Sequence, residues 1–224
     1  MTLEFGLLLL ESVLLVATVI LLIYSLHEGK HRDLLLREVA RFTKVLTRQE
    51  YFFSLMDAMF SAKQEIIGCI TGTPPTGDDI RMTRNIISAI EDQTRKGVSI
   101  KYLLPKFPDR MHIGVRYTMA GAEVRFSSCL MVHSIRFSVI DDRVVVLGVP
   151  ESIGEKEATR KGYAIPSEGL ALLLKNYFYT CEQQTSLKAY LQEVIQHSGA
   201  SLAHLARELH LEEKDLQKII DREI

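Results

Sequence analysis

The hydrophobic pattern begins with one long apolar run near the start of the chain. Residues 5–24 read FGLLLLESVLLVATVILLIY, and Glu11 is the one charged residue among them. About 20 apolar residues cross roughly 30 Å of hydrocarbon as a helix. A carboxylate at mid-bilayer costs on the order of 2.5–3.5 kcal/mol, which the leucines offset. A signal peptide would carry positive charge before the run, and none precedes it. We therefore predict a transmembrane anchor at residues 1–26.

The charges after this run predict its orientation. No lysine or arginine precedes the run, whereas six positive residues follow it closely: Lys30, Arg32, Arg37, Arg41, Lys44 and Arg48. Positive charge beside a membrane helix favours the cytoplasmic side. We expect a single-pass membrane protein whose soluble part lies in the cytoplasm.

A helix-forming stretch without proline or glycine follows, from His31 to about Lys63. Its apolar residues recur in alternating steps of three and four: Leu35, Val39, Phe42, Leu46, Phe53, Met56 and Phe60. This spacing is typical of a helix with one apolar stripe. We predict a helical linker at 27–50. Its stripe either pairs with a second copy in a homodimer or lies on the chain's own domain.

Short β-branched runs then alternate with helical periods. The runs predict strands at 65–71, 98–105, 122–126, 136–140, 143–147 and 162–165. Helices are expected from Asp78 or Asp79 to Gly97, at 109–120, and from the capping Ser167 to Tyr179. The fourth and fifth strands meet at a tight turn, Asp141–Asp142, and a polar loop follows from Glu151 to Lys161. Such alternation predicts an α/β domain, a mostly parallel or mixed sheet with helices on both faces.

The last part of the chain, 185–224, predicts a small helical tail. Two short amphipathic helices fit the residues after Gly199, and Ala206 and Leu216 are spaced as in a helix-turn-helix. The second helix opens with the acidic run EEKD at 212–215, which would meet phosphates and base edges poorly. We favour a pair of helices that caps the domain or contacts a protein.

Composition narrows the classes of function. The net charge of -1 argues against general attraction to nucleic acid. The three cysteines, Cys69, Cys129 and Cys181, lie far apart, which is typical of unpaired buried thiols in a reducing compartment. The histidines show no metal-ligand spacing, and the chain has no phosphate-binding glycine loop. We expect no metal and no cofactor.

Four segments in this order resemble one repeat of the phospholipase D-like superfamily over 51–184. They are KGVSIKYLLP (96–105), GAEVRF (121–126), HSIRFSVIDDRVVVLG (133–148) and GYAIPSEGLALLLKNYF (162–178). The resemblance implies a mixed sheet flanked by helices. In active members one histidine attacks a phosphodiester, a second protonates the leaving alcohol, and lysines hold the phosphoryl oxygens. Single-repeat members bring two motifs together by dimerising.

The motif departs from the HxK pattern of active members, in which four residues separate the lysine from an aspartate. If His133 is taken as the motif histidine, the basic residue is Arg136, one position later than the pattern requires, and the aspartate is Asp141. Counted from Arg136, the nucleophile position holds Ser134. The family's GSxN becomes GVPE at 148–151, so a hydroxyl and an amide are lost and the carboxylate of Glu151 would repel phosphate.

These departures favour a catalytically degenerate binding, sensing or scaffolding module, tethered to the membrane through 5–24. An anionic ligand or a protein partner would occupy the cleft, and we name Ser134, Arg136 and Glu151 as its ligand-binding residues.

The alternative is a dimeric phosphodiesterase acting on phospholipid or nucleic acid. Its nucleophile would be His133, Arg136 would bind phosphate, and Asp141 would orient the histidine. This function needs a β-bulge at 134–135, because strand residues three apart face opposite sides. A membrane-bound transcription regulator is the third hypothesis, and it depends on the tail alone.

Overall fold

The computed structural model describes residues 44–75, 77, 79–129, 132–133, 135–149 and 161–221. The chain divides into two compact units, Met1–Thr43 and Lys44–Ile224, and every described residue belongs to the second. The anchor predicted at 5–24 and the first part of the predicted linker lie outside the described residues. Within the described ranges, no helix is both long enough and apolar enough to cross a membrane.

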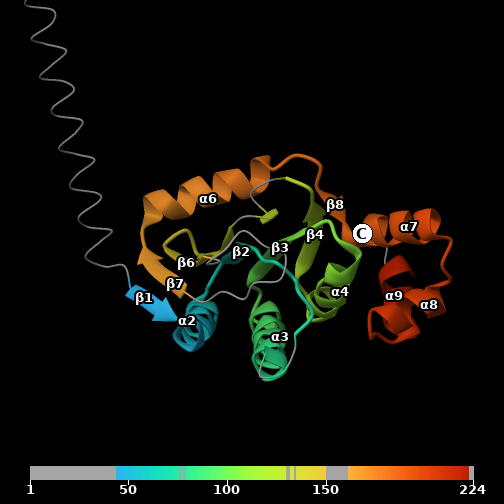
Figure 1. The fold of residues 1–224 in the computed structure, drawn as a ribbon. Helices are drawn as coiled ribbons and strands as arrows, with labels where there is room; N and C mark the ends of the chain where they lie inside the picture. The colour runs from blue at the N-terminus through green and yellow to red at the C-terminus, as the bar shows by residue number, and fades with distance from the viewer. Residues whose placement is uncertain are drawn as a thin grey trace, which may run out of the picture. The chain divides into compact units, whose positions relative to one another are not determined.

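The second unit is built on one mixed sheet of eight strands (Figure 1). In the sheet the strands run in the order β1-β7-β6-β5-β2-β3-β4-β8. The pairs β2–β3 and β3–β4 are parallel, and the other neighbours are antiparallel. The strands are β1 (Lys44–Thr47), β2 (Glu65–Cys69), β3 (Ser99–Pro105), β4 (Glu123–Ser127), β5 (Arg136–Ile140), β6 (Val144–Val149), β7 (Lys161–Pro166) and β8 (Thr185–Ser186). The predicted mixed sheet is confirmed.

Helices cover both faces of this sheet. They are α2 (Arg48–Ser61), α3 (Asp79–Arg95), the 3-10 helix η1 (Pro108–Arg110), α4 (Met111–Met119), α6 (Glu168–Thr180), α7 (Leu187–Ser198), α8 (Leu202–Glu208) and α9 (Glu213–Asp221). The main core joins α2, α3, α4 and α7 to one face of the sheet. On the other face, α6 contacts β2, β5 and β6 and buries Ala171, Leu174 and Phe178. Apolar side chains on both faces explain why the strands read as continuous hydrophobic runs.

Local signals in the sequence fix several boundaries as predicted. Ser167 caps α6, because its side chain accepts a hydrogen bond from the Leu170 amide at 3.2 Å. Asp141 and Asp142 form the turn between β5 and β6, with φ angles of 49° and 57°. Positive φ at both central residues matches the right-handed twist of the paired strands, and aspartate tolerates that conformation. The strands and helices of the domain therefore follow the sequence pattern closely.

The predicted helical linker is wrong at its end. Residues 44–47 are the strand β1, which pairs antiparallel with β7. Thr47 then caps α2 through a capping box with Glu50, so the helix cannot extend backward through β1. The buried positions of α2 include Tyr51, Leu55 and Met59, whereas Phe53 is 66% exposed and Phe60 48% exposed. The described part of the chain thus opens with the strand β1, and the apolar stripe is divided: Leu46 and Met56 pack on the core, whereas Phe53 and Phe60 do not.

The prediction of three unpaired cysteines is wrong for two of them. A disulfide joins Cys129, in the loop after β4, to Cys181 at the end of α6. The two residues are 52 positions apart in the sequence, so only the fold brings them together. Cys69 is free and buried, and burial raises the pKa of its thiol to about 12.

The predicted tail is confirmed as a pair of helices. Leu205 and Ala206 of α8 and Leu216 and Ile219 of α9 are buried. The two helices pack on each other, and α9 also contacts α4 and α7. The tail therefore caps one end of the domain and belongs to the same compact unit, so no boundary falls at 185.

Candidate functional site

The order of the strands reverses between β2 and β5. From β2 the chain proceeds outward to β3 and β4, and then crosses back to place β5 on the other side of β2. In open α/β sheets, ligands bind at such a reversal, outside the carboxyl ends of the parallel strands. Arg136 is the first residue of β5 and lies beside the end of β2, where Cys69 pairs with Phe137. We call this side of the sheet, where β2, β3 and β4 end, the carboxyl edge.

Arg136 has little side-chain bulk beside it on its face of the sheet. It pairs with Gly148 of β6, which pairs in turn with Gly162 of β7. A side chain at Gly162 would overlap the ring of Tyr51, which α2 places over this glycine. Residues two apart share a face, so Ser138 follows Arg136 on the same side. The glycines let the ring of Tyr51 approach the sheet beside the strands that carry Arg136.

Three buried tyrosines gather on this face. Tyr51, Tyr102 and Tyr117 are 6%, 2% and 6% exposed, and the ring centroids of Tyr102 and Tyr117 lie 5.2 Å apart. Above Gly68, an added Cβ would lie 3.1 Å from both Ser138 Oγ and Tyr102 Cε1. Within the described part of the chain, no hydrogen bond joins these three hydroxyls to another residue. We call these residues the carboxyl-edge cluster: Arg136 and Tyr51 lie at the carboxyl edge, and Ser138, Tyr102 and Tyr117 lie farther from it on the same face.

The tyrosines of the cluster are protonated at neutral pH. Burial raises the pKa of Tyr51 to about 12, and the positive charge of Arg136 opposes this shift. Burial also raises the pKa of Tyr102 and of Tyr117 above the usual value. Each hydroxyl therefore offers a hydrogen-bond donor. Of these hydroxyls, that of Tyr51 lies within the field of the Arg136 charge, and a guanidinium beside a neutral donor suits an anion.

The residues predicted from the motif do not all meet at this edge. His133 is exposed and lies edge-on to the ring of Phe107, with centroids 5.2 Å apart. Ser134 and Glu151 lie outside the described residues. Asp141 stands past the far end of β5 from Arg136, about 16 Å away at about 3.3 Å per strand residue. The structure thus brings Arg136 to the carboxyl edge and places Asp141 at the opposite one.

Asp141 is occupied by backbone amides at that opposite edge. Its carboxylate accepts hydrogen bonds from the amides of Lys63 at 2.8 Å, Gln64 at 2.8 Å and Glu65 at 3.0 Å. Burial raises the pKa of Asp141, but these three bonds outweigh burial and hold it below the usual value. The side chain joins the β5–β6 turn to the start of β2.

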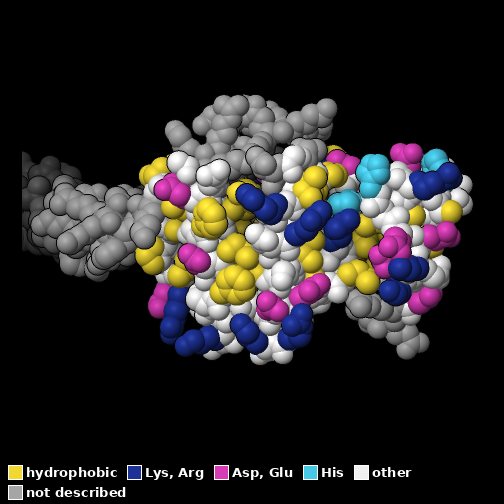
Figure 2. Space-filling view, turned by 90° about the horizontal axis from the view of Figure 1, so that it is seen from below, with side chains coloured by type: hydrophobic (Ala, Val, Ile, Leu, Met, Phe, Trp, Pro, Cys, Tyr) yellow, Lys and Arg dark blue, Asp and Glu magenta, His cyan; other side chains and the backbone are white. Residues whose placement is uncertain are grey.

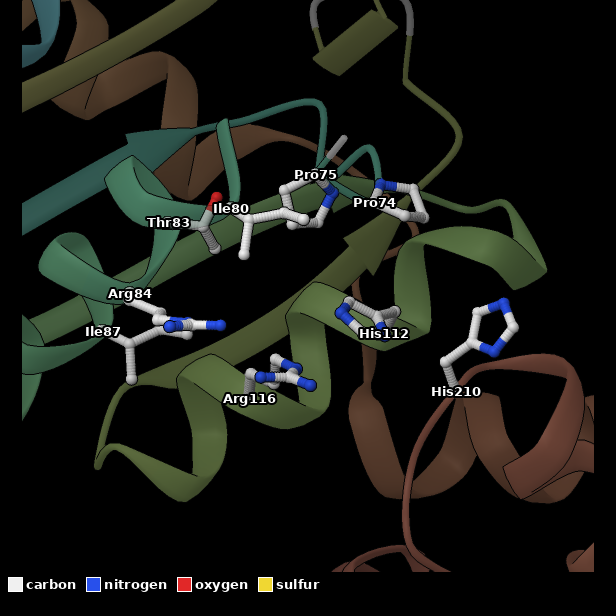
Figure 3. A pocket seen from close by; sticks show the side chains of 9 residues that line it. All are labelled: Pro74, Pro75, Ile80, Thr83, Arg84, Ile87, His112, Arg116 and His210. Atoms are coloured by element: carbon white, nitrogen blue, oxygen red, sulfur yellow. The ribbon is translucent and has the colours of Figure 1, made fainter. Parts of the chain in front are cut away.

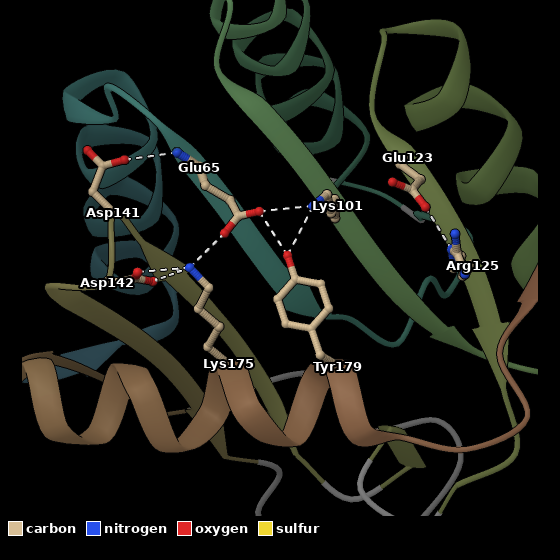
Figure 4. Close-up of polar contacts among 8 residues, drawn as sticks. All are labelled: Glu65, Lys101, Glu123, Arg125, Asp141, Asp142, Lys175 and Tyr179. Atoms are coloured by element: carbon tan, nitrogen blue, oxygen red, sulfur yellow. Dashed lines mark hydrogen bonds and ion pairs between the residues drawn. The ribbon is translucent and has the colours of Figure 1, made fainter.

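Beside Asp141, the charged side chains on the α6 face are paired with one another (Figure 4). Glu65 accepts from Lys101 at 3.0 Å, Lys175 at 2.9 Å and Tyr179 at 2.8 Å. Lys175 also binds Asp142 at 2.8 Å. Burial raises the pKa of Glu65, yet the bonds from Lys175, Lys101 and Tyr179 leave it below the usual value. We call these five residues the amino-edge network.

Sequence reasoning found Arg136 but missed its neighbours. The tyrosines stand where a periodic pattern expects apolar core residues, and Ser138 lies inside a strand. Gly148 and Gly162 belong to segments quoted for the family resemblance, but the pattern gives no sign that they meet across two strands. In the described ranges, no group of three or more His, Cys, Asp or Glu side chains could hold a metal ion.

Comparisons with known proteins give structural likenesses alone. No protein-family model and no curated protein matches the chain. NucT from Helicobacter pylori is 14% identical, with 64% of this chain and 98% of that chain covered and a TM-score of 0.49. Nuc from Salmonella typhimurium, a phospholipase D family member, is 15% identical over 64% of this chain and 96% of its own, with a TM-score of 0.48.

An archaeal chromatin protein, TrmBL2, is also similar in structure. It is 17% identical, with a TM-score of 0.44, and the match covers 68% of this chain. The chain spans 60% of the length of TrmBL2. The structure of TrmBL2 shows a novel mode of DNA binding by that protein. At these identities and scores, none of the three likenesses assigns an activity, a ligand or a partner to this chain.

Proposed function

We propose that this chain is a membrane-tethered binding protein whose phospholipase D-like domain holds an anionic ligand at Arg136 without cleaving it. The carboxyl-edge cluster carries the proposal, because it sets the Arg136 guanidinium beside the buried Tyr51 at the reversal of strand order. An anion beside Arg136 would accept from the guanidinium and from the Tyr51 hydroxyl, which stays protonated and lies within the field of that charge.

The absence of cleavage is inferred from the residues at the motif. In the register that aligns Arg136 with the family's lysine, Ser134 stands where the nucleophilic histidine belongs. The aspartate of the same register, Asp141, accepts from three backbone amides at the other end of β5. Buried tyrosines that stay protonated can donate hydrogen bonds, but they cannot attack phosphorus at neutral pH. Together these features support binding over hydrolysis.

The tether and the oligomeric state belong to the same proposal. The apolar run at 5–24 supports a single membrane span. The positive residues after it favour a cytoplasmic domain, whereas the Cys129–Cys181 disulfide favours an oxidising compartment, so we propose the tether and not its orientation. Phe53 and Phe60 stand exposed on α2, which supports contact with a second copy in a homodimer. Light scattering on the purified full chain, corrected for bound detergent, measures the number of copies.

Binding and hydrolysis of one phosphodiester test the proposed function. We would titrate the full chain with bis(p-nitrophenyl) phosphate by calorimetry and follow nitrophenol release in the same samples. Arg136→Gln should weaken binding about tenfold or more, since a hydrogen bond to a charged group contributes about 1.5–3 kcal/mol. Arg143→Gln is the matched control, because Arg143 is exposed at the opposite end of β5.

The same samples separate the proposal from the phosphodiesterase alternative. We expect no release of nitrophenol above that of the His133→Ala variant. Turnover that disappears in His133→Ala would establish hydrolysis and overturn the proposal. Equal affinity of wild type, Arg136→Gln and Arg143→Gln would show that Arg136 does not hold the anion.

A further inference from the structure

A pocket that does not include Arg136 is lined by residues of α3, α4 and the tail. Its volume is about 250 Å³. Arg84 of α3, His112 and Arg116 of α4, and His210 of the turn between α8 and α9 line it (Figure 3). Three separate elements therefore contribute nitrogen-bearing side chains to one space. The cluster around Arg136 shares none of these residues.

The polar part of this pocket is basic. Among its described lining residues there is no aspartate or glutamate. Figure 3 shows Arg84 and His112 on opposite sides of the pocket, with Arg116 on α4 below His112. On the face over α3 and α4, Lys, Arg and His side chains stand beside hydrophobic ones (Figure 2). A cavity lined by one sign of charge attracts the opposite sign.

His112 is fixed in the wall of the pocket. It is 8% exposed, and its Nδ1 lies 2.6 Å from the carbonyl oxygen of Leu209. A carbonyl can only accept, so Nδ1 carries the hydrogen and Nε2 is the other titrating nitrogen. Burial lowers the pKa of His112, the bond to the Leu209 carbonyl opposes this shift, and the charges of Arg116 and His210 lower the pKa further. The described lining therefore gives these basic groups no negative partner, and a bound anion would supply one.

The other wall of the pocket is apolar. Pro74, Ile80 and Ile87 line it, and Ile80 is 42% exposed. Ligand sites for drug-sized molecules measure about 300–1,000 Å³, so this pocket suits a smaller molecule. One guanidinium group can bind two phosphate oxygens at once, and two guanidinium groups face this pocket. A ligand that satisfies both walls has an anionic end and an apolar end.

We propose that this pocket binds a phosphate monoester with a small apolar substituent. The phosphate would lie between Arg84 and Arg116, with His112 and His210 beside it, and the substituent would lie against Ile80 and Ile87. Because His210 belongs to the tail, the bound ligand would also join α3 and α4 to the α8–α9 turn. The site is independent of the proposed binding at Arg136.

Phenyl phosphate is the probe, titrated into the full chain by calorimetry. Arg84→Gln and Arg116→Gln should each weaken binding about tenfold or more, because each removes a charged hydrogen-bonding group. Arg81→Gln is the matched control, since Arg81 is exposed on the same helix and does not line the pocket. Inorganic phosphate should bind more weakly than phenyl phosphate, because it makes no contact with the apolar wall.

Each outcome decides one part of the proposal. Equal affinity in Arg84→Gln, Arg116→Gln and Arg81→Gln would overturn the site. Loss of binding in Arg136→Gln alone would also overturn it, while leaving the proposed function intact. Equal affinity for inorganic phosphate and phenyl phosphate would overturn the apolar substituent. Circular dichroism of each variant checks the fold, which these substitutions should not affect.

Two sources of the phosphate monoester are distinguished by a second arm. Vesicles that contain phosphatidate present the group on a lipid, and vesicles of phosphatidylcholine alone are their control. Arg84-dependent binding to phosphatidate vesicles would identify a lipid source. Binding to phenyl phosphate without binding to vesicles would identify a soluble one. Failure of both probes to bind would overturn the proposal.

The pH dependence gives a readout that a structural role would not produce. Benzenesulfonate keeps its charge across the range, so a change in its affinity reports on the protein. The groups that face His112 are Arg116 on its own helix, His210 on the α8–α9 turn and Arg84 across the pocket. Affinity should rise as pH falls through the lowered pKa of His112, because protonation adds a donor at Nε2. His112→Gln should flatten this rise, and an unchanged profile would contradict the role of His112.

Discussion

Polar side chains at the two edges of the sheet differ in how many hydrogen-bond partners they have. At the amino edge, Glu65 accepts from three partners, and Asp141 accepts from three backbone amides. At the carboxyl edge, the Tyr51 hydroxyl lies within the field of the Arg136 charge and makes no hydrogen bond to another described residue. The amino edge holds the fold together, and the carboxyl edge is the place that a ligand would complete.

This contrast explains why a motif match can mislead. Arg136 and Asp141 keep the sequence spacing of the family, yet they end at different edges because Arg136 begins the strand β5 and Asp141 directly follows its last residue. The number of residues between two strand positions gives their separation and the face of the sheet on which each lies. It does not tell which group a carboxylate bonds to. Asp141 finds the amides at the start of β2, so its part in holding the turn is visible in the structure alone.

Reducing the disulfide should have the largest effect on the stability of the domain. Cys129 and Cys181 are 52 residues apart, and closing a loop of that length contributes about 4 kcal/mol by chain entropy. Cys129→Ser, compared with wild type under oxidising conditions, should lower the free energy of unfolding by about that amount. Urea denaturation measures it, and addition of a thiol reductant should bring wild type to the level of the variant. No difference between them would contradict the bond.

Removing the carboxylate of Asp141 should have the next largest effect. Asp141→Ala leaves the amides of Lys63, Gln64 and Glu65 without their acceptor, and should lower the free energy of unfolding by about 3 kcal/mol. Asp141→Asn keeps one side-chain oxygen and tolerates the positive φ, so its loss should be smaller. Equal stability of the alanine variant and wild type would show that these bonds do not hold the turn.

The same carboxylate should make stability depend on pH. The pKa of Asp141 is lowered in the folded state, so its contribution is present above the unfolded value of about 3.9 and is lost as pH falls through the folded value. Wild type should therefore lose stability on acidification below about pH 4 more steeply than Asp141→Asn. Parallel slopes for the two proteins in urea denaturation at several pH values would contradict this assignment.

Breaking the amino-edge network at Lys175 should cost less. Lys175→Met removes the contacts to Glu65 and Asp142 and keeps the aliphatic length of the side chain. Glu65 retains Lys101 and Tyr179, and the pairs are partly exposed, so the expected loss is about 1 kcal/mol. Thermal unfolding should show a small drop that salt reduces. A loss as large as that of Asp141→Ala would mean that the network matters more than its exposure suggests.

Removing one hydroxyl at the carboxyl edge should have the smallest effect on stability. Tyr51→Phe deletes a buried group that has no hydrogen-bond partner among the described residues, so stability should change by less than about 0.5 kcal/mol. The same change should weaken binding of the diester, because it removes a donor beside Arg136. A marked loss of stability with unchanged binding would mean that the Tyr51 hydroxyl stabilises the fold and does not hold the ligand.

The sequence predicted most of the fold because local signals and burial agree there. Strand boundaries followed the β-branched runs, Ser167 capped its helix, and the paired aspartates made the hairpin turn. The failures came where a distant contact overrides a local pattern. Residues 44–47 continue a helical period, yet β7 pairs with them, and Cys129 meets Cys181 across the fold.

The candidate site was predictable only in part. Arg136 stood out because its spacing resembles the family's motif, and it lies at the reversal of strand order. The tyrosines gave no signal, because a buried Tyr and a buried Phe occupy the same positions of an apolar pattern. Their convergence on Gly68 and Gly162 depends on pairing between strands and on the placement of α2. These are long-range features that no single segment encodes.

The most direct test of the central claim is a crystal structure of the domain soaked in tungstate, a tetrahedral anion with strong anomalous scattering. We expect an anomalous peak within hydrogen-bonding distance of Arg136 and of at least one hydroxyl of the carboxyl-edge cluster, and none at the amino-edge network. A crystal that shows tungstate elsewhere but none beside Arg136, with that face open to solvent, would contradict the assignment of the carboxyl edge as the binding site.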